Sequence, residues 1–207
     1  DFPQEDYSTL DTIKVTGGVV PDQHWESNRK LFEGAARATA RLGVKFLSMH
    51  AGFIDESDKA MAKKVQTRIR TLADIAKANG LTLLLETGQE AAKDLRHFLE
   101  TLKHESVGVN FDPANMILYD KGDPIEAVRT LSPWIRHLHV KDAVRTAKPG
   151  TWGSEVPWGD GQVGIDRFLA VLGEVGFKGA MAIEREAGDN RLGDIKLAAQ
   201  RLQAACK

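Results

Sequence analysis

Apolar residues recur along the chain in two patterns that alternate from one end to the other. Six segments place apolar residues three or four positions apart, which is typical of one face of a helix. The first helix is expected to bury Leu31, Ala35, Ala38 and Leu42, and Ser57 is expected to cap the second. The six helices are predicted over Glu26–Leu42, between Ser57 and Asn79, around Leu95–Leu102, from Asp123 to Pro133, around Phe168–Val175 and around Ile195–Leu202.

Between these segments lie five short runs that are almost continuously apolar. Such runs suit strands of a parallel sheet that is buried on both faces. Strands and helices alternate throughout, which predicts an α/β fold with right-handed crossovers. Residues 1–25 and the glycine-rich stretch 151–161 show no sustained period, so loops are expected there. The predicted strands are Val44–His50, Leu81–Glu86, Val107–Asp112, the run through His137–Val140, and Gly179–Glu184.

Four successive strands end in a side chain that can bind a metal ion, namely Glu86, Asp112, His139 and Glu184. A single acidic residue at a strand end is usually solvated, and a single histidine in a strand usually belongs to the core. Four in succession are different, because burying three carboxylates together requires a cation. Three oxygen donors and one imidazole suit one divalent ion such as Mn²⁺, Mg²⁺, Co²⁺ or Zn²⁺, and the ligands alone do not decide among these metals.

The motifs around these strand ends, taken in order, resemble those of the xylose-isomerase-like TIM barrels. This family contains sugar and sugar-phosphate isomerases and epimerases and is related to the endonuclease IV type. The resemblance covers residues 26–207 and implies a (β/α)₈ barrel of which the chain carries the last five β/α units, without the first three. Residues 1–207 would then form a single domain that is incomplete at its amino end. The motifs are Leu85–Thr87, Asn110–Asn115, His137–Asp142, Gly159–Asp166 and Ala182–Glu184.

The resemblance also implies a chemistry. In ketose 3-epimerases of this kind, the residues that match Glu86, Asp112, His139 and Glu184 hold one metal ion. A metal that chelates a carbonyl and an adjacent hydroxyl acidifies the neighbouring C–H bond, and a carboxylate on each face of the enediolate can remove and return the proton. Glu86 and Glu184 are the expected catalytic pair. The expected function is therefore that of a metal-dependent isomerase or epimerase of a sugar, sugar phosphate or related polyol.

Five further residues are expected to bind the substrate: His50, Asn115, Lys141, Arg145 and Trp158. In the related epimerases the arginine six residues after the ligand histidine contacts substrate, and Arg145 has that spacing. Lys141 and Arg145 can hold a substrate oxygen or phosphate, although exposed charges after a strand are about as common. His50 ends the strand before the first carboxylate. Asn115 can hydrogen-bond a sugar hydroxyl where related epimerases often carry histidine, and Trp158 can form a wall of a sugar site.

Three other functions stay open from the sequence. Dehydration of a keto-inositol would use the same proton abstraction. A phosphodiesterase of the endonuclease IV type would need a zinc cluster rich in histidine, whereas this chain has Asn115 and a near-neutral net charge. Loss of the first three strands could also leave an inactive module that binds a sugar or a metal.

Composition narrows the expected partners to a small-molecule substrate. The 207 residues include 28 basic and 29 acidic side chains, so the net charge is −1 and nucleic acid is not expected as a partner. The single Cys206 excludes an intrachain disulfide and a cysteine-based zinc site. No run has membrane-spanning length and no signal pattern opens the sequence, so a cytoplasmic location is expected. A barrel without its first strands would expose two sheet edges, which favours a homo-oligomer.

Overall fold

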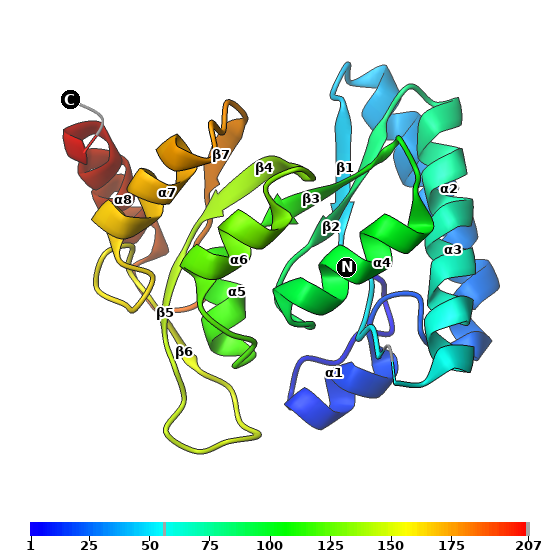
Figure 1. Cartoon of the computed structure of the whole chain (residues 1–207), viewed down its shortest axis with the longest axis horizontal. Helices are drawn as coiled ribbons and strands as arrows, with labels where there is room; N and C mark the ends of the chain where they lie inside the picture. The colour runs from blue at the N-terminus through cyan, green and yellow to red at the C-terminus, as the bar shows by residue number, and fades with distance from the viewer. Residues whose placement is uncertain (56, 206–207) are drawn as a thin grey trace. The chain divides into compact units, whose positions relative to one another are not determined.

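The computed structural model of the protein describes residues 1–55 and 57–205 (Figure 1). Cys206, on which the expectations about disulfides and zinc depend, lies outside the described residues. By its internal contacts the chain divides into two compact units, residues 1–86 with 93–109 and residues 87–92 with 110–207. The division falls inside the strand β3 (Val107–Phe111), so that each unit carries part of a sheet.

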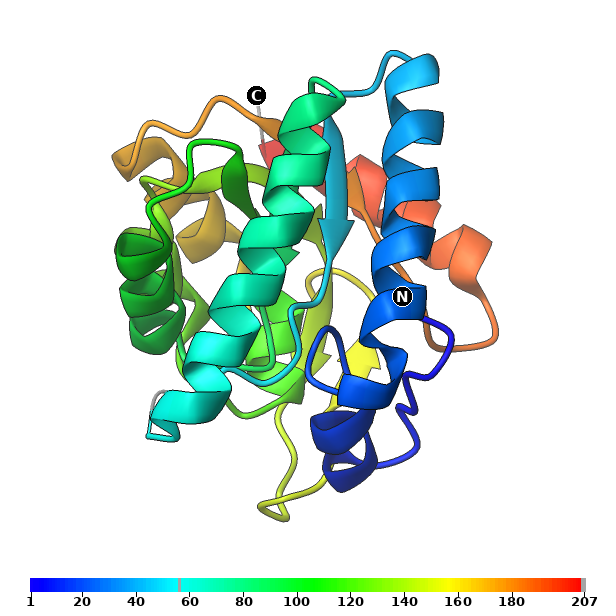
Figure 2. The same ribbon diagram turned by 90° about the vertical axis from the view of Figure 1, so that its right-hand side faces the viewer.

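The first unit builds its part of the sheet from β1 (Phe46–Met49), β2 (Thr82–Glu86) and the beginning of β3. β1 and β2 are parallel, with Phe46 opposite Thr82. Helices α2 and α3 lie side by side next to β1 (Figure 2). The helical elements here are α1 (Leu10–Thr16), the 3₁₀ helix η1 (Asp22–His24), α2 (Trp25–Arg41), α3 (Lys59–Ala78) and α4 (Ala92–Leu102).

The second unit continues with the end of β3, β4 (Ile135–Val140) and β7 (Ala180–Ile183). β4 and β7 are parallel, with His139 opposite Ala182. A separate antiparallel hairpin follows β4 directly and consists of β5 (Asp142–Val144) and β6 (Ser154–Val156). The helices of this unit are α5 (Pro113–Leu118), α6 (Pro124–Leu131), α7 (Ile165–Glu174) and α8 (Arg191–Ala205).

The five strands of the sheet have the order β1-β2-β3-β4-β7, and helices separate them along the sequence. Each predicted strand is present, and the α/β fold with a parallel sheet is confirmed. Five parallel strands with intervening helices correspond to part of a TIM-type barrel. Among the described residues, no helix is both long and apolar enough to cross a membrane.

The predicted apolar faces hold for some helices and fail for others. The face of α3 is buried as expected, with Val65, Ile69, Leu72 and Ala76 in the core. The helix predicted over Glu26–Leu42 is present as α2, but its predicted apolar face was wrong, because Leu31 and Leu42 are 49% and 79% exposed. A polar residue occupies an inward position of this helix, since the buried side chain of Asn28 donates to the carbonyl of Gly18. The residues that α2 buries are Asn28, Phe32 and Ala36.

The closing helix α8 also departs from its predicted face. Ile195 is exposed, and Ala198 is the residue that α8 buries. The most buried position of this helix is therefore occupied by a small residue. Because the burial of alanine contributes little to an apolar pattern, the larger Ile195 dominated the sequence signal.

Two predicted loops contain secondary structure. Within residues 1–25, the side chains of Thr9 and Thr12 each accept a hydrogen bond from the other's amide, and this capping box begins α1. Within 151–161, the residues of β6 pair with β5. The cap of α3 is Asp58 rather than Ser57, because Asp58 accepts from the first amides of the helix. The two caps depend on polar side chains and β6 depends on its pairing with β5, and an apolar period detects neither.

Candidate metal site

Asp112 directly follows β3 and is fully buried. Its Oδ1 accepts a hydrogen bond from the amide of Asn115 at 3.0 Å and thereby caps α5. Pro113 occupies the first helical position, where its missing N–H costs nothing. The Asp-Pro pair is a sequence signal for this short helix, which the apolar pattern alone did not predict. Since the cap uses Oδ1, the other oxygen, Oδ2, faces the side chains of β4.

His139 projects from β4 toward two carboxylates. Its Nδ1 lies 3.3 Å from Oδ2 of Asp112 and 3.2 Å from Oε2 of Glu184. Its Nε2 lies 3.1 Å from the side-chain amide of Asn110, whose oxygen lies 2.8 Å from Nδ1 of His137. The first nitrogen, Nδ1, is therefore the one that could bind a metal between the two carboxylates. In that state Nε2 would carry the proton. The side-chain amide of Asn110 would then be flipped, so that its oxygen accepts a hydrogen bond from Nε2–H.

Glu184 follows β7 and is anchored by its own amide, which donates to the carbonyl of Val140 at 3.2 Å. Its Oε2 accepts a hydrogen bond from the ammonium of Lys141 at 2.9 Å. Burial alone would raise the pKa of Glu184, but the hydrogen bond from His139 and the charge of Lys141 lower that pKa below its ordinary value. The carboxylate is thus held in its ionised form, in which it can serve as a ligand.

Lys141 brings a positive charge into this acidic cluster. Only 2% of the residue is exposed, and its Nζ lies 3.5 Å from Asp112 and 2.5 Å from Glu186 in addition to its bond with Glu184. Burial alone would lower the pKa of Lys141, but the three carboxylates raise it above its ordinary value. Glu186 was not among the residues predicted from the sequence, although its position two residues after Glu184 is a signal that could have identified it.

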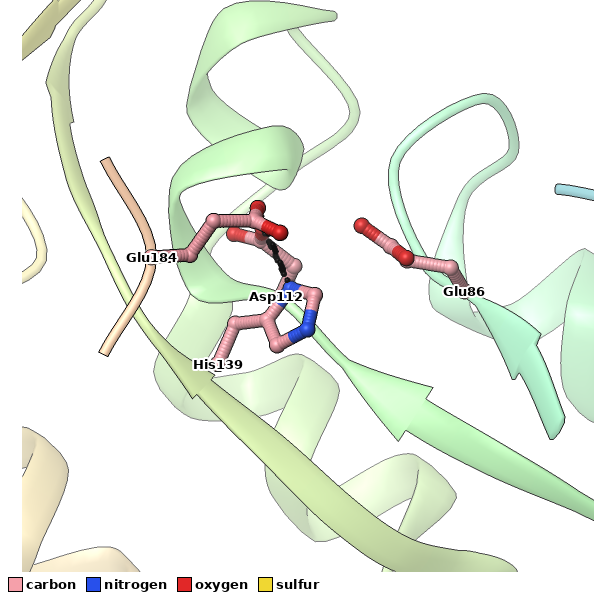
Figure 3. Close-up of side chains that lie close together, drawn as sticks. All are labelled: Glu86, Asp112, His139 and Glu184. Atoms are coloured by element: carbon pink, nitrogen blue, oxygen red, sulfur yellow. Dashed lines mark hydrogen bonds and ion pairs between the residues drawn. The ribbon is translucent and has the colours of Figure 1, made fainter. Parts of the chain in front are cut away.

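The donor atoms of the second unit fit a divalent cation. One ligand atom from each of Asp112, His139 and Glu184 lies within 4.8 Å of the others (Figure 3). We call these three residues the ligand trio. Two carboxylates and one imidazole are donors that Mg²⁺, Mn²⁺ and Zn²⁺ all accept in proteins. With Lys141 counted, the two carboxylates keep one net negative charge, so a cation remains favoured there.

Glu86 belongs to the first unit, where it ends β2. Its Oε1 lies 3.8 Å from Nε2 of His50, which follows β1. Figure 3 draws Glu86 together with the ligand trio. The next residue, Thr87, is part of the second unit and forms two hydrogen bonds with the backbone of Asp112. Covalent continuity therefore limits how far the backbone of Glu86 can lie from that of Asp112.

The other predicted substrate residues have different surroundings. Asn115 is buried, with its Oδ1 3.5 Å from Nζ of Lys141, which places it beside the ligand trio. Arg145 instead pairs with Asp120 and donates to the carbonyl of Gly122. Trp158 is 3% exposed and packs edge to face on Phe168 with ring centroids 5.8 Å apart. The structure thus brings Asn115 and Lys141 to the trio, and it places Arg145 and Trp158 in contacts of their own.

Comparisons with known proteins agree with the observed fold. A family model described as a xylose isomerase-like TIM barrel matches residues 7–205. The crystal structure of a xylose isomerase domain protein from Planctomyces limnophilus superimposes with a TM-score of 0.93 at 33% identity. That match covers 99% of this chain and 74% of the other.

Two further similarities are more distant. YihM of Escherichia coli K12 is 29% identical over 119 residues, which are 57% of this chain, and the chain spans only 35% of the length of YihM. A xylose isomerase-like TIM barrel protein from Mycobacterium smegmatis, solved in complex with magnesium, has a TM-score of 0.72 at 21% identity, with 92% of this chain and 71% of the other covered. Other similar structures, between 14% and 19% identical, include sugar epimerases and a probable dehydratase. At such identities the likeness shows the fold alone.

Proposed function

Because the chain belongs to the xylose isomerase-like TIM-barrel family, we propose that it forms part of a metal-dependent enzyme that isomerises or epimerises a sugar, a sugar phosphate or a related polyol. The observation that carries the proposal is the convergence of Asp112, His139 and Glu184, whose ligand atoms come from the ends of three neighbouring strands. Several of the similar solved structures are sugar epimerases, which favours catalysis over mere binding.

We propose Glu86 as the fourth ligand. Thr87 accepts a hydrogen bond from the amide of Asp112 at 2.8 Å and donates one to its carbonyl at 3.0 Å. Glu86 is covalently bound to Thr87, so these bonds keep its backbone next to that of Asp112. The adjacent order of β2, β3, β4 and β7 supports the same ligand set, because parallel strands end on one side of a sheet.

In the proposed reaction the chain supplies the groups that move the proton. A divalent ion held by the four ligands would polarise a carbonyl and an adjacent hydroxyl and so acidify the C–H bond of the hydroxyl-bearing carbon next to the carbonyl. Glu184 is ionised and is therefore available to accept that proton as a general base. Glu86, from a different strand, would return a proton on the other side of the enediolate.

Two neighbours of the trio suit the binding of a hydroxylated substrate. The ammonium of Lys141 can donate to a developing oxyanion, because it stays charged at neutral pH. Asn115 offers an amide beside that ammonium, and an amide can both donate to and accept from a sugar hydroxyl. Arg145 and Trp158 would join the substrate site only if their present contacts with Asp120 and Phe168 were exchanged for it.

Metal binding is tested first, by titrating the protein with Mn²⁺, Mg²⁺, Co²⁺ and Zn²⁺ in a calorimeter. Saturable binding of one ion is expected, with a large loss of affinity in Asp112→Asn and Glu184→Gln. Glu100→Gln is the matched control, because Glu100 is an exposed carboxylate on α4 that pairs with Arg96. Equal affinity in all of these proteins would refute the site.

The reaction is tested by incubating the metal-loaded protein with a panel of ketoses, their phosphates and keto-inositols in deuterated water. Incorporation of deuterium at the carbon beside the carbonyl is expected, and Glu184→Gln should abolish it. Elimination of water that accompanies the exchange would identify a dehydratase. Cleavage of a DNA duplex with an abasic site, without any exchange in the sugars, would contradict the proposal and indicate a phosphodiesterase.

A further inference from the structure

The segment that follows β7, residues 184–187, is held by hydrogen bonds to two separate groups of side chains. Glu184 and Glu186 both accept hydrogen bonds from Lys141, at 2.9 and 2.5 Å. Arg185, between them, makes its ion pairs with a different pair of residues, Glu155 and Asp194. Alternate residues of this segment therefore serve two separate clusters, one at the ligand trio and one away from it.

The second cluster is a nearly buried ion-pair network. Nη1 of Arg185 lies 2.6 Å from Oε1 of Glu155 on β6, and its Nε lies 2.8 Å from Oδ2 of Asp194 in the first turn of α8. The side chains of Arg185 and Glu155 are only 8% and 6% exposed. Charged hydrogen bonds in such surroundings are short and strongly directional. The network therefore fixes Arg185 much more firmly than an exposed ion pair would.

Glu155 also holds the backbone beyond Arg185. The same oxygen, Oε1, accepts hydrogen bonds from the amides of Glu186 and Ala187, at 3.0 and 3.4 Å. One carboxylate thus binds the side chain of the residue after Glu184 and the amides of the next two. A Cβ on residue 188 would lie 2.6 Å from the guanidinium of Arg185, so the glycine there leaves room for the Arg185 side chain.

The hairpin that carries Glu155 also carries Lys141 at its base. β5 begins at Asp142, directly after Lys141, and Ala143 on β5 is opposite Glu155 on β6. The hairpin therefore contacts the segment with Lys141 on one side and with Glu155 on the other. The pairing of β5 with β6 therefore links the backbone next to Lys141 to the backbone that carries Glu155.

We propose that Glu155 is a positioning residue that fixes the carboxylate of Glu184 at the metal site. It acts through Arg185 and the two amides, and it does not itself contact the metal or the substrate. The inference rests on the proposed function, because it treats Glu184 as a metal ligand. Residues that orient metal ligands from outside typically contribute about 10- to 100-fold to metal affinity.

The test compares Glu155→Gln with Glu174→Gln. Glu174 is a suitable control because it too pairs with an arginine, Arg129, through two hydrogen bonds, but on the exposed surface. In metal-free protein, Glu155→Gln should accelerate hydrogen exchange at the amides of Glu186 and Ala187. Hydrogen exchange at the backbone amides of β4 should stay unchanged. In the Mn²⁺ titration it should raise the dissociation constant by about 10-fold or more. Glu174→Gln should change neither measurement.

Each outcome bears on a different claim. The positioning role would be overturned if Glu155→Gln had the same hydrogen exchange and the same Mn²⁺ affinity as the unmodified protein. Faster exchange in Glu155→Gln with unaltered Mn²⁺ affinity would overturn it as well. If the unmodified protein bound no metal, the proposed function would fall, while the exchange measurement would still show whether Glu155 holds the segment. If Glu155→Gln does not fold, Arg185→Lys replaces it, since lysine keeps the charge but offers a single nitrogen in place of the two, Nη1 and Nε, that bind Glu155 and Asp194 separately.

Discussion

The hydroxyl of Thr87 forms two hydrogen bonds with the backbone of Asp112. It accepts one from the amide at 2.8 Å and donates one to the carbonyl at 3.0 Å. Both residues are almost completely buried, and they are 25 positions apart in the sequence. A single hydroxyl thus replaces a strand partner at the point where β3 ends. It sets the backbone from which the Asp112 carboxylate projects.

Thr87→Val is predicted to destabilise the protein and to weaken its metal site. Valine has nearly the same shape but leaves the buried amide and carbonyl of Asp112 without partners, which costs about 1–3 kcal/mol for each unsatisfied group. Thr87→Ser keeps the hydroxyl and is the matched control. In urea unfolding, Thr87→Val should lose more unfolding free energy than Thr87→Ser. In the Mn²⁺ titration, Thr87→Val should likewise lose more affinity than Thr87→Ser. Equal effects of the two substitutions would mean that the methyl group, not the hydroxyl, carries the role of Thr87.

Lys141→Met is predicted to lower the stability of the metal-free protein strongly. Removal of this buried charge leaves Asp112 and Glu184 facing each other without compensation, and breaking a buried ion pair in this way costs about 3–5 kcal/mol. Bound Mn²⁺ should restore part of the loss, because it would supply the missing positive charge. Lys77→Met is the control, since Lys77 is an exposed partner of Glu105. A metal-free Lys141→Met protein as stable as the Lys77→Met control would show that Lys141 does not hold the carboxylates together.

The sign of the pH effect follows from the raised pKa of Lys141. A lysine whose pKa is raised by folding stabilises the protein fully below its unfolded pKa of about 10.4 and loses this contribution only as the pH rises through the folded value. The difference in unfolding free energy between the unmodified protein and Lys141→Met should therefore be nearly constant from neutral pH to pH 9. A difference that vanished in that range would contradict the ion-paired state of Lys141.

The strands and their terminal side chains could be predicted from sequence because each leaves a strong local signal. A continuous apolar run marks β2 and a nearly continuous one marks β3, and a charged residue after such a run marks the strand end. Parity along β4 also predicted that His137 and His139 share a face, and both contact Asn110 in the structure. What a sequence of this kind specifies well is therefore the order of strands and the side chains at their ends.

Other parts of the cluster depend on contacts between distant segments and left little local signal. Nothing in the residues around Glu155 shows that its carboxylate will meet Arg185, 30 positions later. The burial of Lys141 is likewise a result of the three carboxylates around it, and a lysine after a strand usually lies at the surface. Glu186 differs, because its spacing from Glu184 was visible in the sequence.

The hairpin that carries Glu155 depends on another buried carboxylate, Asp142. Its Oδ1 accepts hydrogen bonds from the amides of Ala143 and Val163, and its Oδ2 accepts from those of Gly159 and Gly161. Four amides thus bind one side chain that is 1% exposed. The stretch expected to be a plain glycine-rich loop is therefore organised around this residue.

Asp142→Asn is predicted to loosen this loop although it changes only one atom. The side-chain nitrogen of asparagine cannot accept a hydrogen bond, so two of the four backbone amides would lose their partner. Each unsatisfied amide would lower the free energy of unfolding by about 1–3 kcal/mol. Asp160→Asn is the matched control on the same loop, since Asp160 is half exposed and pairs with Arg201. Urea unfolding should show a clear loss for Asp142→Asn and almost none for the control, with faster hydrogen exchange at Gly159, Gly161 and Val163. If both variants were equally stable, the loop would be held by its own backbone turns, and Asp142 would have no part in carrying the hairpin.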